Sequence, residues 1–67
     1  MEIKINVFIV VESYLFYSER NRGVFLNLDQ AVNNASGAIR IEKHSTVTNE
    51  LAAIYTTDGE LIYKNTV

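Results

Sequence analysis

Apolar residues occupy every odd-numbered position from Ile3 to Val11. A period of two is typical of a β-strand that turns one face toward a core, so the start of the chain predicts a strand within residues 2–17. The even-numbered positions begin polar and become apolar at Phe8 and Val10. We therefore expect the middle of this strand to be covered on both faces, either by the rest of the chain or by a partner.

The chain is short, with 67 residues of which 48% are apolar, and it contains no cysteine. A domain of this size buries only about 60% of the surface that its unfolded chain exposes, and no disulfide can stabilise it. Residues 1–67 are therefore expected to form a single domain that depends on efficient packing or on a second copy of itself. The apolar fraction is too high for a disordered tail, and no apolar run reaches the roughly 18 residues of a membrane span.

The first strand is expected to return through a polar turn. Residues 18–23 read Ser-Glu-Arg-Asn-Arg-Gly and contain no apolar side chain, and Gly23 can take a positive φ at low cost. The apolar residues 24–26 then predict a short second strand, which gives a hairpin with a loop longer than two residues.

A second hairpin is expected near the end of the chain. The dipeptide Asp58-Gly59 separates two stretches rich in β-branched and aromatic residues, 49–57 and 60–65. An Asp-Gly pair in this setting favours a two-residue type I′ turn, which fixes the register of the two strands. The expected cross-strand pairs are Thr57 with Glu60, Tyr55 with Ile62, and Ile54 with Tyr63.

A short helix is expected between the two hairpins. Asn27 is a suitable N-cap with Gln30 three residues later, and Gly37 is a suitable terminator. This spacing predicts a helix of about nine or ten residues that packs one apolar stripe against the sheet. The stripe consists of Leu28, Ala31, Val32 and Ala35.

Residues 38–44 alternate again, with Ile39 and Ile41 on one side of an expected strand. Residues 45–52 fit either a strand or the start of a helix. The element order is therefore β-β-α-β-β-β, and the predicted fold class is α+β. We expect a small antiparallel sheet of four to five strands with one short helix packed on one face.

The sequence contains no recognisable catalytic constellation. His44 is the only imidazole, and in a strand its neighbours Lys43 and Ser45 point to the opposite face, so it reads as a surface histidine. The three glycines are isolated, which argues against a phosphate-binding loop, and metal ligands are too few. We therefore predict that the protein is not an enzyme and uses no cofactor or metal.

Aromatic and basic side chains gather around the expected first hairpin. Tyrosine and arginine are enriched at binding hot spots, and the apolar surface exceeds what so small a chain can bury. We therefore expect a protein-binding surface here, although the same aromatic side chains could instead complete the domain's own core. The candidate binding residues are Tyr14, Phe16, Tyr17, Arg20, Arg22 and Phe25.

Two other functions fit parts of the sequence. One is a structural or housekeeping domain that forms a homodimer through an edge strand, with the first strand as the candidate. The other is binding of single-stranded nucleic acid by Arg20 and Arg22 among the aromatic residues. The net charge of −2 argues against this second function, because phosphate backbones attract basic surfaces.

The order of features resembles that of small proteins carried by bacteriophages and mobile elements. Residues 23–31, Gly-Val-Phe-Leu-Asn-Leu-Asp-Gln-Ala, open the expected helix, and residues 54–63, Ile-Tyr-Thr-Thr-Asp-Gly-Glu-Leu-Ile-Tyr, form the closing hairpin. This layout of helix, strand and closing hairpin is similar to that of short anti-CRISPR proteins of the type I-F class. The resemblance implies a non-enzymatic inhibitor that occludes a surface of a host protein or protein complex in the host cytoplasm. It assigns no role to any single residue.

Overall fold

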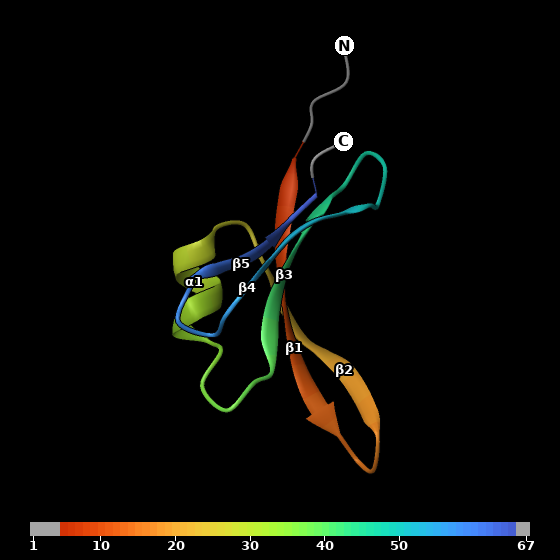
Figure 1. Cartoon of the computed structure of the whole chain (residues 1–67), viewed down its shortest axis with the longest axis vertical. Coiled ribbons are helices and arrows are strands. Elements are labelled where there is room, and N and C mark those ends of the chain that lie inside the picture. The colour runs from red at the N-terminus through yellow and green to blue at the C-terminus, as the bar shows by residue number, and fades with distance from the viewer. Residues whose placement is uncertain (1–4, 66–67) are drawn as a thin grey trace.

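The computed structural model describes residues 5–65 as one curled antiparallel sheet and one short helix (Figure 1). The strands lie in the order β2-β1-β3-β4-β5 across the sheet. The sheet therefore makes up most of the molecule, and the helix is a minor element. The elements are β1 (Asn6–Tyr14), β2 (Ser18–Phe25), α1 (Leu28–Asn33), β3 (Arg40–Ser45), β4 (Leu51–Tyr55) and β5 (Leu61–Lys64).

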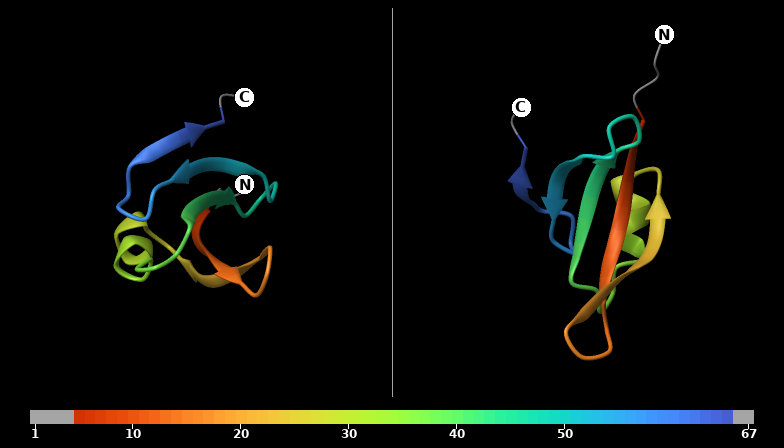
Figure 2. Two further views of the ribbon diagram at one scale, coloured as in Figure 1. Left: turned by 60° about the horizontal axis from the view of Figure 1, so that its bottom comes forward. Right: turned by 90° about the vertical axis from the view of Figure 1, so that its right-hand side faces the viewer.

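The first strand lies inside the sheet, between β2 and β3, and not at an edge. From Asn6 to Val11 its hydrogen-bonding groups are therefore used within the chain. The sheet edges are formed by β2 and β5, which lie at opposite ends of the twisted sheet (Figure 2). The first strand is thus not the edge strand that was expected to pair with a second copy, and the homodimer itself stays a prediction. The part of the predicted strand at residues 2–4 lies outside the described residues.

The core lies between α1 and one face of the sheet. Its buried members are small or β-branched: Val10, Ala31, Ala35 and Ile41. The side of β1 that faces the helix is therefore the even-numbered one, and the odd-numbered side lies on the opposite face. The reason is size, because a helix of six residues can cover only the short apolar stretch made by Phe8 and Val10.

The helix begins at the predicted N-cap, where Asn27 Oδ1 accepts a hydrogen bond from the Gln30 amide at 2.9 Å. Its predicted stripe packs on the core, but the helix has six residues and is shorter than expected. The backbone tightens into three-residue turns after Asn33, because asparagine is a poor helix former. Gly37, with a φ of 77°, lies past this tightened end.

The first hairpin turns at residues 15–17, and not at residues 18–23 as expected. The polar residues belong to β2, where Arg20 pairs with Glu12 across the strands. A shift in register between Val10 and Val11 leaves Arg22 as a bulged residue. Polarity was a misleading signal here because β2 is an edge strand, whose polar side chains remain exposed to solvent.

The second hairpin has a three-residue loop, 57–59, in place of the expected two-residue turn. The Thr56 amide donates to the Glu60 carbonyl at 2.8 Å, and Gly59 takes a φ of 91°. The Thr56 hydroxyl accepts hydrogen bonds from the amides of Asp58 and Glu60, which stabilises the longer loop. The expected pair of Ile54 with Tyr63 is confirmed, whereas Tyr55 faces Leu61 in place of Ile62, and Thr57 does not face Glu60.

The stretch 45–52, which fitted either a strand or the start of a helix, contains the last residue of β3, a turn and the start of β4. Strand β3 begins at Arg40, two residues later than expected, so Ile39 is exposed. Among residues 5–65, no helix is long enough and apolar enough to cross a membrane.

Candidate protein-binding surface

The last residue of β1 and the turn that follows it carry four consecutive large side chains, Tyr14 to Tyr17, which we name the hairpin tip. Leu15 is 73% exposed, Phe16 is 89% exposed and Tyr17 is fully exposed. The tip lies at the far end of the longest axis of the molecule (lower end of Figure 1). Large apolar groups that project in this way mark an interaction site more often than scattered single residues do.

The backbone of the tip adopts an unfavourable conformation for these residue types. Leu15 has a φ of 53° and Tyr17 a φ of 63°, in the left-handed region that suits glycine or asparagine. A bulky residue there costs about 1–2 kcal/mol, and such costs tend to accumulate at functional sites. Folding alone therefore gives no reason for leucine and tyrosine at these two positions.

A carboxylate at the base of the tip holds two arginines in place. The Glu12 carboxylate accepts hydrogen bonds from Arg20 Nε and Arg22 Nε, and Arg22 and Arg20 together hold the pKa of Glu12 below its usual range. The Arg20 guanidinium also lies 4.3 Å from the centre of the Tyr14 ring. This cation–π contact orients the first aromatic side chain of the tip.

Arg22 also connects the hairpin to the end of α1. Its Nη1 donates to the Asn34 carbonyl at 3.1 Å and to the Ser36 carbonyl at 2.7 Å. The last carbonyls of a helix lack partners within the helix, so a guanidinium suits this position. Arg22 therefore serves the architecture of the domain and does not reach the tip.

On the opposite face of the sheet, Arg40 joins β2 to β3 across β1. Its guanidinium donates to both Glu19 carboxylate oxygens, at 2.8 and 3.1 Å, and to Glu42 at 2.6 Å. His44 Nε2 is hydrogen-bonded to the other Glu42 oxygen at 2.8 Å. These groups rim an open groove of about 320 Å³ over the apolar side chains of Ile9 and Val11.

The groups that rim this groove satisfy one another. Burial raises the pKa of Glu42, but hydrogen bonds with His44 and Arg40 outweigh that effect and leave the pKa below its usual value. Arg40 likewise lowers the pKa of Glu19. The charged groups that rim the groove therefore form one ionic network over Val11. Each guanidinium that lines the groove has a carboxylate partner.

The structure divides the six predicted binding residues into two groups. Tyr14, Phe16, Tyr17 and Arg20 lie together in or beside the hairpin tip. Arg22 braces the hairpin against α1, and Phe25 packs against the core. Sequence reasoning missed Leu15, although it lies within the same apolar run, because that run was interpreted as an extension of the strand.

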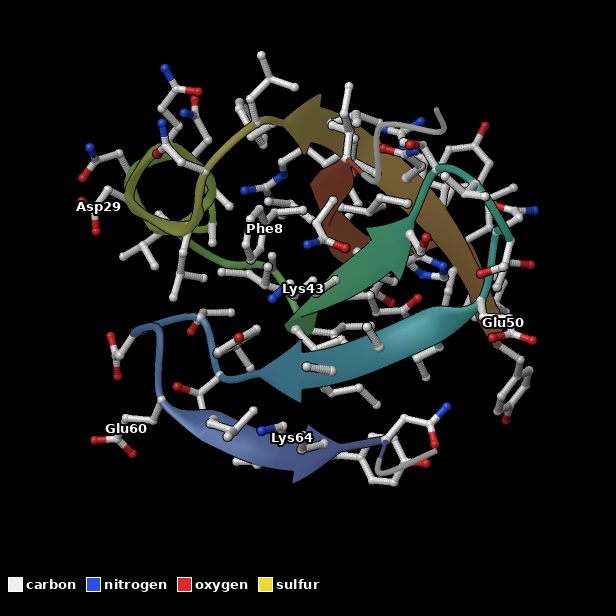
Figure 3. The ribbon with its side chains drawn as sticks, turned by 90° about the horizontal axis from the view of Figure 1, so that it is seen from above. Phe8, Asp29, Lys43, Glu50, Glu60 and Lys64 are labelled. Carbon is white, nitrogen blue, oxygen red and sulfur yellow. The ribbon has the colours of Figure 1, made fainter. Side chains whose placement is uncertain are left out.

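His44 was expected on the surface, but its side chain is only 20% exposed and belongs to the ionic network. Its neighbour Lys43 does point to the opposite face, where its ammonium group lies 5.9 Å from the centre of the Phe8 ring (Figure 3). Within residues 5–65, no group of three or more ligand side chains could hold a metal ion. No protein-family model, curated protein or solved structure matches the chain.

Proposed function

We propose that this chain is a small protein-binding module that acts without catalysis and places its hairpin tip in an apolar pocket of a partner protein. The proposal is carried by one observation, the exposure of four consecutive large side chains on a turn with an unfavourable backbone conformation. Aromatic side chains that fill pockets commonly dominate the binding energy of an interface. They also lose little conformational entropy on binding.

The partner we propose is a protein or protein complex of a bacterial host, which the module inhibits by occluding a surface in the host cytoplasm. Two considerations support inhibition by occlusion. A projecting tip can fill a pocket that another ligand would use, and the layout of the chain resembles that of short phage-encoded inhibitors. The tip residues Tyr14, Leu15, Phe16 and Tyr17, with Arg20 beside them, would make the contact.

Binding of single-stranded nucleic acid receives less support. All three arginines in the sequence are paired with carboxylates, which leaves little positive potential for a phosphate backbone. Exposed aromatic rings alone could stack on bases, but nucleic-acid sites usually combine stacking with a basic groove.

The test is a capture experiment with matched variants. Tagged wild-type protein, Leu15→Ser and Leu26→Ser are each incubated with lysate of the source or its host, with and without nuclease treatment, and captured proteins are identified by mass spectrometry. Leu15 and Leu26 are both 73% exposed, so the two variants remove the same side chain at the same exposure from different places. We expect one stoichiometric protein with wild type and Leu26→Ser, and its loss with Leu15→Ser.

The captured protein is then titrated against purified Phe16→Ser. Loss of a central aromatic anchor should weaken binding by at least thirtyfold, which corresponds to about 2 kcal/mol. If Phe16→Ser and wild type bind with equal affinity, the hairpin tip is not part of the interface. Material that disappears on nuclease treatment would instead favour nucleic-acid binding.

A further inference from the structure

The outer half of the first hairpin extends beyond the rest of the sheet. Strand β3 pairs with β1 only as far as Val11, which faces Arg40. Residues 12–20, which we name the hairpin arm, form strand pairs only with each other among the described residues. An isolated two-stranded hairpin is marginally stable in water and free to bend about its base.

Two ionic contacts connect the arm to the body of the domain, one on each face of the sheet. On the helix face, Arg22 joins Glu12 in the arm to the carbonyls of Asn34 and Ser36. On the other face, Arg40 in β3 joins Glu19 in the arm to Glu42. Contacts on opposite faces oppose bending in both directions, because a swing toward either face must break one of them.

Both contacts use the geometry that is particular to arginine. Arg40 presents two nitrogens to the Glu19 carboxylate and its Nε to Glu42, and Arg22 divides its donors between a carboxylate and two carbonyls. Such divided contacts require a planar group with several fixed donors, which the single ammonium of lysine cannot replace. Each guanidinium therefore fixes a direction as well as a distance.

We infer that Arg22 and Arg40 are positioning residues for the hairpin tip: they fix the direction in which the arm projects, so that the tip meets its partner already oriented. The role in binding rests on the proposed function, whereas the effect on the arm does not. Fixing a binding loop in its bound orientation raises affinity by reducing the entropy lost on association.

The arm is tested first, without any partner. Backbone ¹⁵N relaxation is measured for wild type, Arg22→Gln and Glu19→Gln, because Glu19→Gln removes the second contact while leaving Arg40 and Glu42 in the body intact. The control is Arg20→Gln, which removes the same charge as Arg22→Gln from a residue whose contacts, with Glu12 and Tyr14, lie within the arm. Dispersed amide spectra confirm that each variant folds.

We expect order parameters of about 0.85 for the arm amides of wild type and Arg20→Gln. In Arg22→Gln and in Glu19→Gln we expect the order parameters of the arm to fall toward about 0.6. The double variant Arg22→Gln/Glu19→Gln should fall furthest. Arm amides that stay as ordered in the double variant as in wild type would overturn the inference, as would an arm that is already mobile in wild type. If Arg22→Gln does not fold, Arg22→Lys takes its place, with the same expectation.

Binding to the captured partner is measured second. The double variant should bind about tenfold more weakly than wild type although its tip is unchanged. The affinity of Glu19→Gln should lie between those of wild type and the double variant. A looser arm with unchanged affinity would show that the two contacts do not position the tip. If Leu15→Ser and Leu26→Ser capture the same proteins, the proposed function fails, and the relaxation data still decide whether the contacts orient the arm.

Discussion

Leu15 and Tyr17 are the residues at which the requirements of folding and of binding differ most clearly. Both adopt a positive φ that costs a bulky side chain about 1–2 kcal/mol, and both side chains lie mostly in solvent. Gly59 is the contrasting case, because it adopts a φ of 91° in a loop where glycine carries no such cost. The second hairpin thus uses the residue that its backbone needs, and the first does not.

Substitution of the two glycines with positive φ, Gly37 and Gly59, should lower the free energy of unfolding by different amounts. In Gly59→Ala the new methyl group would lie 3.0 Å from Val32 Cγ2, whereas in Gly37→Ala its nearest neighbour would be 3.9 Å away. We expect Gly37→Ala to lower the free energy of unfolding by about 1 kcal/mol and Gly59→Ala by about 2 kcal/mol, measured by urea denaturation. Equal losses would show that the Val32 side chain moves aside at no cost to stability.

At the scale of elements, the hairpin arm depends on carboxylates that must be ionised. Glu12 and Glu19 have lowered pKa values in the folded protein because of their arginine partners, and the pKa of Glu42 is lowered by hydrogen bonds with His44 and Arg40. A lowered folded pKa gives stability that is fully present above the unfolded pKa of about 4.3. That stability is lost as the pH falls through the folded pKa.

The expected result is a free energy of unfolding that is steady near neutral pH and falls below about pH 5. Glu12→Gln should flatten this fall, and Arg20→Gln/Arg22→Gln should flatten it in the same way, since either change removes the same ion pairs. Combining all three substitutions should add little, because they act on one network. Urea denaturation between pH 3 and pH 7 measures this, at about half-unit steps, and additive effects would contradict the assignment.

The whole molecule has a small core, and its stability margin is correspondingly narrow. Among residues 5–65, only a few apolar side chains are fully buried, with Ile41 and Val10 the largest of them. Ile41→Ala should therefore lower the free energy of unfolding by about 3 kcal/mol, a large part of the total for so small a domain. The control is Ile62→Ala on the exposed strand β5, for which we expect a change within about 0.5 kcal/mol in thermal or urea unfolding.

Much of this architecture could be predicted from local patterns. Alternation located the first and third strands, and the cap at Asn27 and the apolar stripe located the helix. The predictions failed where long-range context overrides a local signal. Residues 18–23 look like a turn but form an edge strand, and the Thr56 hydroxyl lengthens a loop that Asp-Gly alone would close in two residues. Four predicted binding residues do meet at the tip, but Arg22 and Phe25 have structural roles that only tertiary contacts show.

We propose that the hairpin tip serves binding and not the domain's own core. The most direct test is urea denaturation of the triple variant Leu15→Asn/Phe16→Ser/Tyr17→Gly, which suits the left-handed turn and removes three exposed side chains. If the tip does not stabilise the fold, the free energy of unfolding of this variant should equal that of wild type or be higher by up to about 1 kcal/mol. A loss of more than about 1 kcal/mol would show that these side chains stabilise the fold itself and would contradict a role in binding alone.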